Sequence, residues 1–197
     1  MKTSIILFDA DGVLTLPEEV FSVMYARSRG FDSGPFEQFF RNDWHAIVTG
    51  KKDLKESIAK NPDLWQWNKS IDELLAYWFK TEDVRNDELL TLIHELRSRG
   101  VPCYLATDQE KYRGQYMQNV MFKDLFDGFF ISADLGVSKT DPRFFEMIIE
   151  ELRQKHQGIE PQDIIFFDDS QSKVDTACSV GINGQLYVNT QQVRSLL

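Results

Sequence analysis

Short apolar runs alternate with longer amphipathic stretches along most of this chain. The unbroken runs Ile5–Phe8 and Ile164–Phe167 are typical of strands that are buried on both faces of a sheet. Apolar segments at 102–106 and 128–131 predict two more strands, and a fifth is expected around 186–188.

Helical spacing of apolar residues predicts the elements between these strands. Helices are expected over 87–98, 111–119 and 171–179, after the capping pair Asp141-Pro142, and at the C-terminal end. This alternation of strands and helices predicts an α/β fold, a Rossmann-like parallel sheet with helices on both faces.

Residues 16–85 interrupt the alternation, because they contain no convincing strand. Helices are predicted at 18–29, 35–47 and 52–60, and around the apolar positions Leu74, Leu75 and Trp78. We therefore expect a catalytic core made of residues 1–15 and 86–197, with an inserted α-helical cap at 16–85. Because this insert starts directly after a pair of carboxylates, a lid over the site is the favoured role, and a purely structural extension is the alternative.

Polar side chains follow the strands at their C-terminal ends. In an open parallel sheet these ends meet at one rim, which is where ligands bind. Acidic, basic and hydroxyl groups in this position are Asp9, Asp11, Thr107, Asp108, Lys139, Asp168 and Asp169. Read singly, these residues also fit an Asp-Gly turn, a helix cap or a solvated lysine; their order along the chain favours a common site.

This combination of groups suits phosphoryl transfer. Several carboxylates at one rim need a compensating cation, and oxygen ligands without a nearby histidine favour Mg²⁺ over zinc. The metal and a lysine would neutralise phosphoryl oxygens, and a hydroxyl such as that of Thr107 would hold another. One aspartate would attack phosphorus, and a second carboxyl group would exchange protons with the leaving alcohol and with water.

Composition narrows the partners and the compartment. The net charge of −9 disfavours binding to a phosphate backbone, so nucleic acid is not expected as a partner. The only two cysteines, Cys103 and Cys178, have no metal-ligand spacing and are expected to be buried free thiols. No signal peptide or membrane span is apparent, so a cytoplasmic protein without a membrane partner is expected, as a monomer or homodimer.

The ordered motifs resemble those of the haloacid dehalogenase superfamily of hydrolases. The stretches that carry the resemblance are Asp9-Ala10-Asp11-Gly12-Val13-Leu14-Thr15, Thr107-Asp108, Lys139-Thr140-Asp141-Pro142 and Asp168-Asp169-Ser170. The insert is similar to the small helical cap of the family's first subclass, and Leu105–Glu110 is similar to sugar-phosphate phosphatases of that subclass.

The resemblance implies a role for each residue. Asp9 would be the nucleophile and a metal ligand, and Asp11 the general acid/base with its backbone carbonyl on the metal. Thr107, Asp108 and Lys139 would bind the phosphoryl group. The remaining metal ligands would be Asp169 and, directly or through water, Asp168. An acid at position 11 favours phosphate chemistry over carbon–halogen cleavage.

The expected function is a magnesium-dependent phosphatase acting on a small phosphorylated metabolite, such as a sugar phosphate, through an aspartyl-phosphate. A phosphomutase of the same family and a non-catalytic binding protein with the same fold are the alternatives. Substrate choice would lie in the cap, where Arg41, Trp44, His45, Lys51 and Lys52 are candidates for contact with a substrate.

Overall fold

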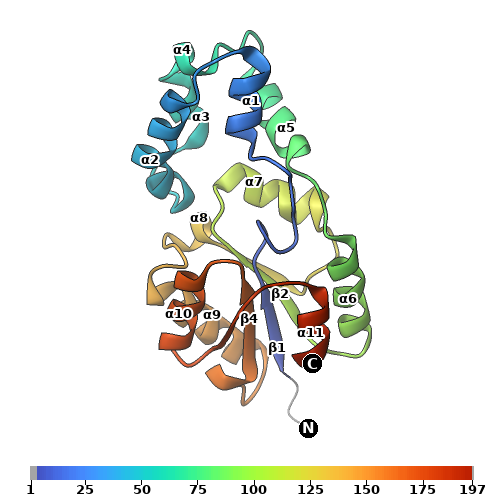
Figure 1. Ribbon diagram of the computed structural model, residues 1–197. Helices are drawn as coiled ribbons and strands as arrows, with labels where there is room; N and C mark the ends of the chain where they lie inside the picture. The colour runs from blue at the N-terminus through green and yellow to red at the C-terminus, as the bar shows by residue number, and fades with distance from the viewer. Residues whose placement is uncertain (1–3, 197) are drawn as a thin grey trace.

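The computed structural model describes residues 4–196, in which a parallel sheet lies below a group of helices (Figure 1). The five strands are β1 (Ile5–Phe8), β2 (Cys103–Thr107), β3 (Gly128–Ile131), β4 (Ile164–Asp168) and β5 (Asn183–Leu186). They are ordered β3-β2-β1-β4-β5, and each neighbouring pair is parallel. The predicted α/β fold is therefore confirmed, with β1 at the centre of the sheet.

Helices cover both faces of this sheet. Their bounds are α6 (Asp87–Ser98), α7 (Lys111–Tyr116), the π-helical turn η1 (Met117–Met121), α8 (Ser132–Leu135), α9 (Pro142–Lys155), the 3-10 helix η2 (Pro161–Asp163), α10 (Gln171–Ser179) and α11 (Thr190–Leu196). Within residues 4–196, none of the helices has an apolar stretch long enough to cross a bilayer.

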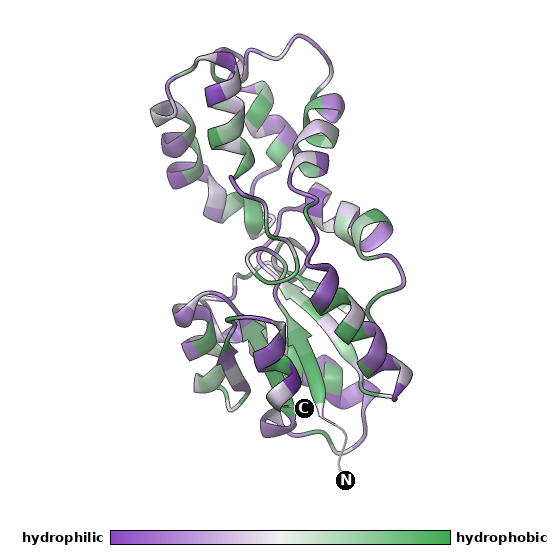
Figure 2. Cartoon of the chain, turned by 45° about the vertical axis from the view of Figure 1, so that its right-hand side comes forward, coloured by the Kyte–Doolittle hydropathy of each residue, from purple (hydrophilic) through white to green (hydrophobic). Residues whose placement is uncertain are grey.

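The alternation of side chains along β1 divides the core into two layers. Ile6 and Phe8 pack with α6, η1 and α11 on one face of the sheet, whereas Ile5 and Leu7 pack with α9 and α10 on the other. All four are at most 1% exposed, which explains why this strand is an unbroken apolar run. Figure 2 shows the same pattern as a hydrophobic sheet with more polar helix surfaces outside it.

Residues 16–85 form a separate group of helices beyond the C-terminal edge of the sheet (Figure 1). They are α1 (Phe21–Arg29), α2 (Gly34–Val48), α3 (Leu54–Ala59), α4 (Pro62–Trp65) and α5 (Ile71–Thr81). This group has its own aromatic core, in which Trp78 stacks on Phe21 and Trp65. Burial of such large rings gives the helices a core of their own, and Tyr112 and Tyr116 of α7 pack against it from the side of the sheet.

Two chain segments that run side by side connect this helical group to the sheet. Thr15 forms an antiparallel bridge with Arg85, and the backbone N–H of Leu16 donates to the carbonyl of Val84 at 2.8 Å. The next link is the backbone N–H of Asn86, which donates to Leu14 O at 2.9 Å. The chain therefore leaves and re-enters the sheet at one narrow place.

The fifth strand differs from its prediction, because it lies at Asn183–Leu186 instead of around 186–188. It is an edge strand of largely polar sequence, and the prediction from apolar runs therefore places it too far along the chain. Gly184 is required there because a Cβ at this position would lie 2.8 Å from the backbone oxygen of Val174 in α10. Cys178, expected to be buried, is exposed, whereas Cys103 is buried as predicted.

We expect α9 to tolerate substitution on one face only. Ile148→Ala should lower the free energy of unfolding by about 2–5 kcal/mol, because it leaves a cavity against the sheet. Met147→Ala, at a neighbouring position that is 42% exposed, is the control and should change it by no more than about 0.5 kcal/mol. Equal losses in urea unfolding would contradict the packing of α9 described above.

Candidate active site

Asp9 is the first residue beyond β1 and lies inside the protein, only 2% exposed. Its backbone N–H donates to Phe167 O at 2.9 Å, so pairing with the neighbouring strand still fixes its backbone. Its carboxylate accepts a hydrogen bond from the N–H of Ala10 at 2.7 Å, and the carbonyl of Ala10 in turn accepts from Leu14 and Thr15. This tight turn holds the Asp9 side chain at the rim of the sheet.

Gly12 allows the turn to pass close to the loop after β4. Its φ of +81° is in the left-handed region, and a Cβ added there would lie 2.1 Å from Asp169 Oδ2. Any side chain at position 12 would therefore strain the backbone and displace Asp169.

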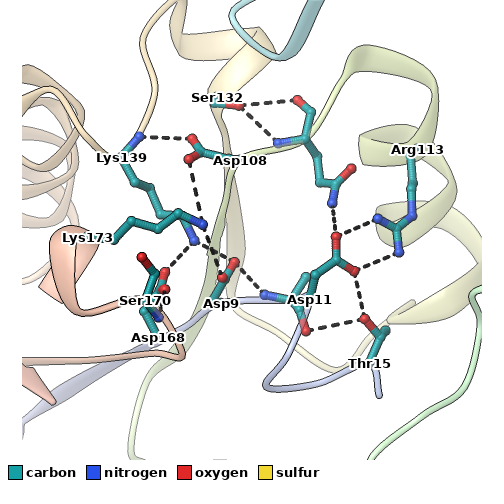
Figure 3. A network of polar contacts seen from close by, with 12 residues as sticks. Asp9, Asp11, Thr15, Asp108, Arg113, Ser132, Lys139, Asp168, Ser170 and Lys173 are labelled. Carbon is teal, nitrogen blue, oxygen red and sulfur yellow. Dashed lines mark hydrogen bonds and ion pairs between the residues drawn. The ribbon is translucent and has the colours of Figure 1, made fainter. Parts of the chain in front are cut away.

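A cluster of carboxylates surrounds a buried lysine at this rim (Figure 3). Asp9, Asp168 and Asp169 each offer an oxygen within 4.8 Å of the others. Lys139 Nζ lies 2.5 Å from Asp9 Oδ1 and 2.6 Å from Asp168 Oδ2, and its side chain is fully buried. Asp108 accepts a hydrogen bond from the backbone N–H of Lys139 at 2.9 Å, which ties the lysine loop to the end of β2.

The negative charge of this cluster exceeds what the nearby lysines supply. Burial raises the pKa of the Asp9 carboxyl; Lys139 opposes this, and the charge of Asp168 adds to it. Burial and the charge of Asp9 also raise the pKa of Asp169. Lys173 Nζ is the second positive group, a more distant partner at 3.9 Å from both Asp9 Oδ2 and Asp108 Oδ2. Three carboxylates that share so little positive charge are a donor set suited to a divalent cation.

The same carboxylates act on the lysine. Burial by itself lowers the pKa of the Lys139 ammonium, but the charges of Asp9, Asp168 and Asp108 outweigh that effect and raise it. Lys139 is therefore held as a fixed positive charge inside the site.

Asp11 points away from this cluster and is held by a second group of residues. Arg113 forms two hydrogen bonds with its carboxylate, at 2.6 and 2.7 Å, from α7. The side chains of Gln109 and Thr15 donate to the same carboxylate, at 2.5 and 2.8 Å. The Asp11 side chain is 47% exposed. Burial of its carboxyl group acts to raise the pKa, but the charge of Arg113 and the hydrogen bonds that the carboxylate accepts outweigh this effect and lower the pKa.

Two further carboxylates flank Arg113. Glu82, at the end of α5, lies 3.4 Å from its guanidinium and accepts a hydrogen bond from the N–H of Phe21. Glu110 caps α7 by accepting from the backbone N–H groups of Tyr112 and Arg113. Burial raises the pKa of Glu110 to about 7, although these hydrogen bonds and the charge of Arg113 oppose the shift.

The structure brings the residues proposed from the sequence to one rim. Thr107, at the end of β2, is 1% exposed, and within residues 4–196 its hydroxyl has no hydrogen-bond partner. The Asp11 carboxylate lies outside the acidic cluster, so any contribution of Asp11 to a metal would come from its backbone. Of the cap residues considered above, Trp44 lines a cavity beside Asp11.

Sequence reasoning missed Arg113, Gln109 and Lys173. Arg113 and Lys173 stand in helices that follow β2 and β4, where a basic residue looks like an ordinary solvated charge. Their position in the sequence could have indicated a role in the site. Each lies near the start of a helix that directly follows a strand ending in an aspartate motif.

Comparisons with known proteins agree with this geometry. A family model described as haloacid dehalogenase-like hydrolase matches residues 3–181. The chain is 22% identical to a phosphorylated carbohydrates phosphatase of Thermotoga maritima, over 90% of this chain and 81% of that protein. It is 25% identical to a phosphatase of Mycobacterium tuberculosis, over 98% of this chain and 91% of that protein.

Solved structures share the fold at low sequence identity. One is a HAD family enzyme of Bacteroides thetaiotaomicron in complex with magnesium and inorganic phosphate. It superposes with a TM-score of 0.78 at 18% identity, over 97% of this chain and 98% of that chain.

The raised pKa of Glu110 predicts a pH-dependent stability. Its folded-state pKa lies above the ordinary value of 4.5, so the folded protein binds more protons and loses stability as pH rises from 4.5 toward 7. The free energy of unfolding of Glu110→Gln, relative to that of wild type, should therefore increase by about 2–3 kcal/mol between pH 5 and pH 8.

Urea unfolding at the two pH values measures this change. Glu146→Gln, on an exposed part of α9, is the control and should keep a constant difference from wild type. A constant difference for Glu110→Gln as well would show that Glu110 titrates normally.

Proposed function

The chain belongs to the haloacid dehalogenase-like hydrolase family, and from this we propose that it is a magnesium-dependent phosphatase of small phosphomonoesters. The observation that carries the proposal is the buried Lys139 between Asp9 and Asp168, beside a third carboxylate from Asp169. The phosphatase names of two relatives and the magnesium and phosphate in a neighbouring structure support it.

The donor set fits a magnesium ion. Asp9, Asp168 and Asp169 would hold the ion through carboxylate oxygens, and Asp11 would add its backbone carbonyl. When bound, magnesium supplies positive charge that balances the carboxylates and the phosphoryl oxygens. The absence of any side chain at Gly12 keeps Asp169 within reach of this position.

Asp9 is the proposed nucleophile, and the reaction is proposed to pass through an aspartyl-phosphate. Its carboxylate is held by the turn after β1 and faces Lys139, which neutralises charge on the incoming phosphoryl group. Thr107 and Lys173 line the same rim, and the unpartnered Thr107 hydroxyl is suited to donate to a phosphoryl oxygen.

Asp11 is the proposed acid and base. Paired with Arg113 it is a carboxylate, the form that accepts a proton from water when the phosphorylated Asp9 is hydrolysed. To donate a proton to the leaving alcohol in the first step, Asp11 must loosen its contact with Arg113 and hold a proton. It takes that proton from solvent before the first turnover, and from the attacking water of the second step in each later one. Glu82 lies 3.4 Å from the guanidinium and offers it an alternative partner.

Residues 16–85 are proposed to act as a cap, with 1–15 and 86–197 as the catalytic core. Supporting this division, the helical group has a separate aromatic core and joins the sheet through the paired segments at Thr15–Leu16 and Val84–Arg85. Its helices α2 and α5 contribute to a cavity next to Asp11, as expected of a cap that selects substrates.

Hydrolysis of p-nitrophenyl phosphate tests the proposed chemistry. Wild type should release phosphate only with magnesium, and Asp9→Asn should lower kcat by roughly a thousandfold or more because the nucleophile is lost. Asp175→Asn, at an exposed aspartate of α10, is the control and should keep wild-type activity. Trapping the acyl phosphate with borohydride should label Asp9.

Either of two results would contradict the proposal. Activity that persists in Asp9→Asn would exclude Asp9 as nucleophile. A wild-type protein that hydrolyses neither p-nitrophenyl phosphate nor acetyl phosphate, and whose melting temperature does not respond to magnesium, would exclude the phosphatase itself.

A further inference from the structure

Two cavities meet at Asp11. One, of about 490 Å³, is lined by Asp169 and Lys173 and lies on the side of the acidic cluster. The other, of about 280 Å³, lies between the core and helices α2 and α5. Asp11 and Glu82 line both cavities. Under the proposed function, the phosphoryl group occupies the first space, and the alcohol that it leaves extends past Asp11 into the second.

Aromatic rings make up the wall of the second cavity. Phe40 and Trp44 come from α2, and Trp78 and Phe79 come from α5. Trp44 and Trp78 are stacked with ring centroids 6.1 Å apart, and Phe40 meets Trp78 edge to face at 5.9 Å. Rings already arranged in this way offer both a face and an edge to another planar ring.

Few polar groups in this cavity are free to serve a ligand. Gln109 Oε1, Arg113 Nε and Trp78 Nε1 are buried and, within residues 4–196, have no hydrogen-bond partner, so the buried atoms of this lining offer one free acceptor and two free donors. A sugar would bring more hydroxyls than these three atoms can pair, and each unpaired hydroxyl that gives up water costs free energy.

The charges at the floor disfavour a second anionic group on the ligand. The guanidinium of Arg113 is already paired with Asp11 and lies within 3.4 Å of Glu82. Glu110 adds another carboxyl group to the lining. A sugar bisphosphate or a dicarboxylate would therefore place its extra charge beside acidic groups.

We propose that this cavity binds the alcohol part of the substrate, and that this alcohol carries an uncharged planar aromatic ring on a short linker. The inference rests on the proposed phosphatase activity. It deepens that activity by giving the substrate class as aryl-bearing phosphomonoesters instead of sugar phosphates. The volume of about 280 Å³ lies just below the usual range of about 300–1,000 Å³ for ligand sites, so the aromatic group is small.

Three phosphomonoesters test the class of alcohol directly. Benzyl phosphate, cyclohexylmethyl phosphate and glucose 6-phosphate each carry the phosphate on a primary carbon next to a six-membered ring. Wild-type kcat/KM should be roughly fivefold higher for the benzyl than for the cyclohexylmethyl compound, because stacking adds to apolar burial. It should exceed that for glucose 6-phosphate by about a hundredfold, because hydroxyls are left unpaired.

Trp44 provides the matched variants, because it lines the cavity but lies outside the phosphoryl site. Trp44→Leu should lower kcat/KM for benzyl phosphate by about tenfold and abolish the preference for benzyl over cyclohexylmethyl. Trp44→Phe should restore most of that preference. Trp67→Leu, at another half-buried tryptophan of the helical group, is the control and should behave as wild type.

Different results separate failure of this inference from failure of the proposed function. If acetyl phosphate is hydrolysed but glucose 6-phosphate is preferred to benzyl phosphate, the phosphatase stands and the aromatic specificity is wrong. Equal effects of Trp44→Leu and Trp67→Leu would also overturn the assigned cavity.

Calorimetric binding tests the preference for an aromatic ring if none of the phosphate compounds is turned over, or if Trp44→Leu does not fold. Benzylphosphonate should then bind wild type, with magnesium present, at least about fivefold more tightly than cyclohexylmethylphosphonate. Equal or absent binding would overturn the inference.

Discussion

The contact of the Lys139 ammonium with the carboxylates of Asp9 and Asp168 is the interaction on which the rest of the site depends. All three side chains are buried, and each would be costly to bury alone. The contact also joins three distant parts of the chain, namely the end of β1, the loop after α8 and the end of β4. It therefore fixes the rim and leaves a surplus of negative charge, which suits a divalent cation.

The order of the strands explains why these groups meet. β1 lies at the centre between β2 and β4, so the residues that follow the carboxyl ends of these three strands share one edge of the sheet. The helix after β2 then sends Arg113 back to Asp11, and the helix after β4 sends Lys173 toward Asp9. The two carboxylates at positions 9 and 11 consequently face different surroundings, one a lysine within an acidic cluster and the other an arginine.

Under the proposed function, the helical group selects the substrate while it lies outside the acidic cluster. It has its own aromatic cluster, and some of the same rings also line the cavity next to Asp11. On this proposal, different elements carry the chemistry and the choice of substrate, as in other enzymes that place variable sites on a fixed fold. Glu82, which lies at the end of α5 and contacts Arg113, joins the helical group to the residues around Asp11.

The sequence by itself determined the family, the parallel sheet and the residues at the strand ends, because buried strands are unbroken apolar runs and their polar ends are local features. It misplaced β5, since a half-exposed edge strand has no such run. It also missed Arg113, Gln109 and Lys173. Only the tertiary structure decided these partners, together with the aromatic cavity, because an ion pair such as Asp11–Arg113 joins residues 102 positions apart. No local pattern records such a contact; packing of helices against the sheet creates it.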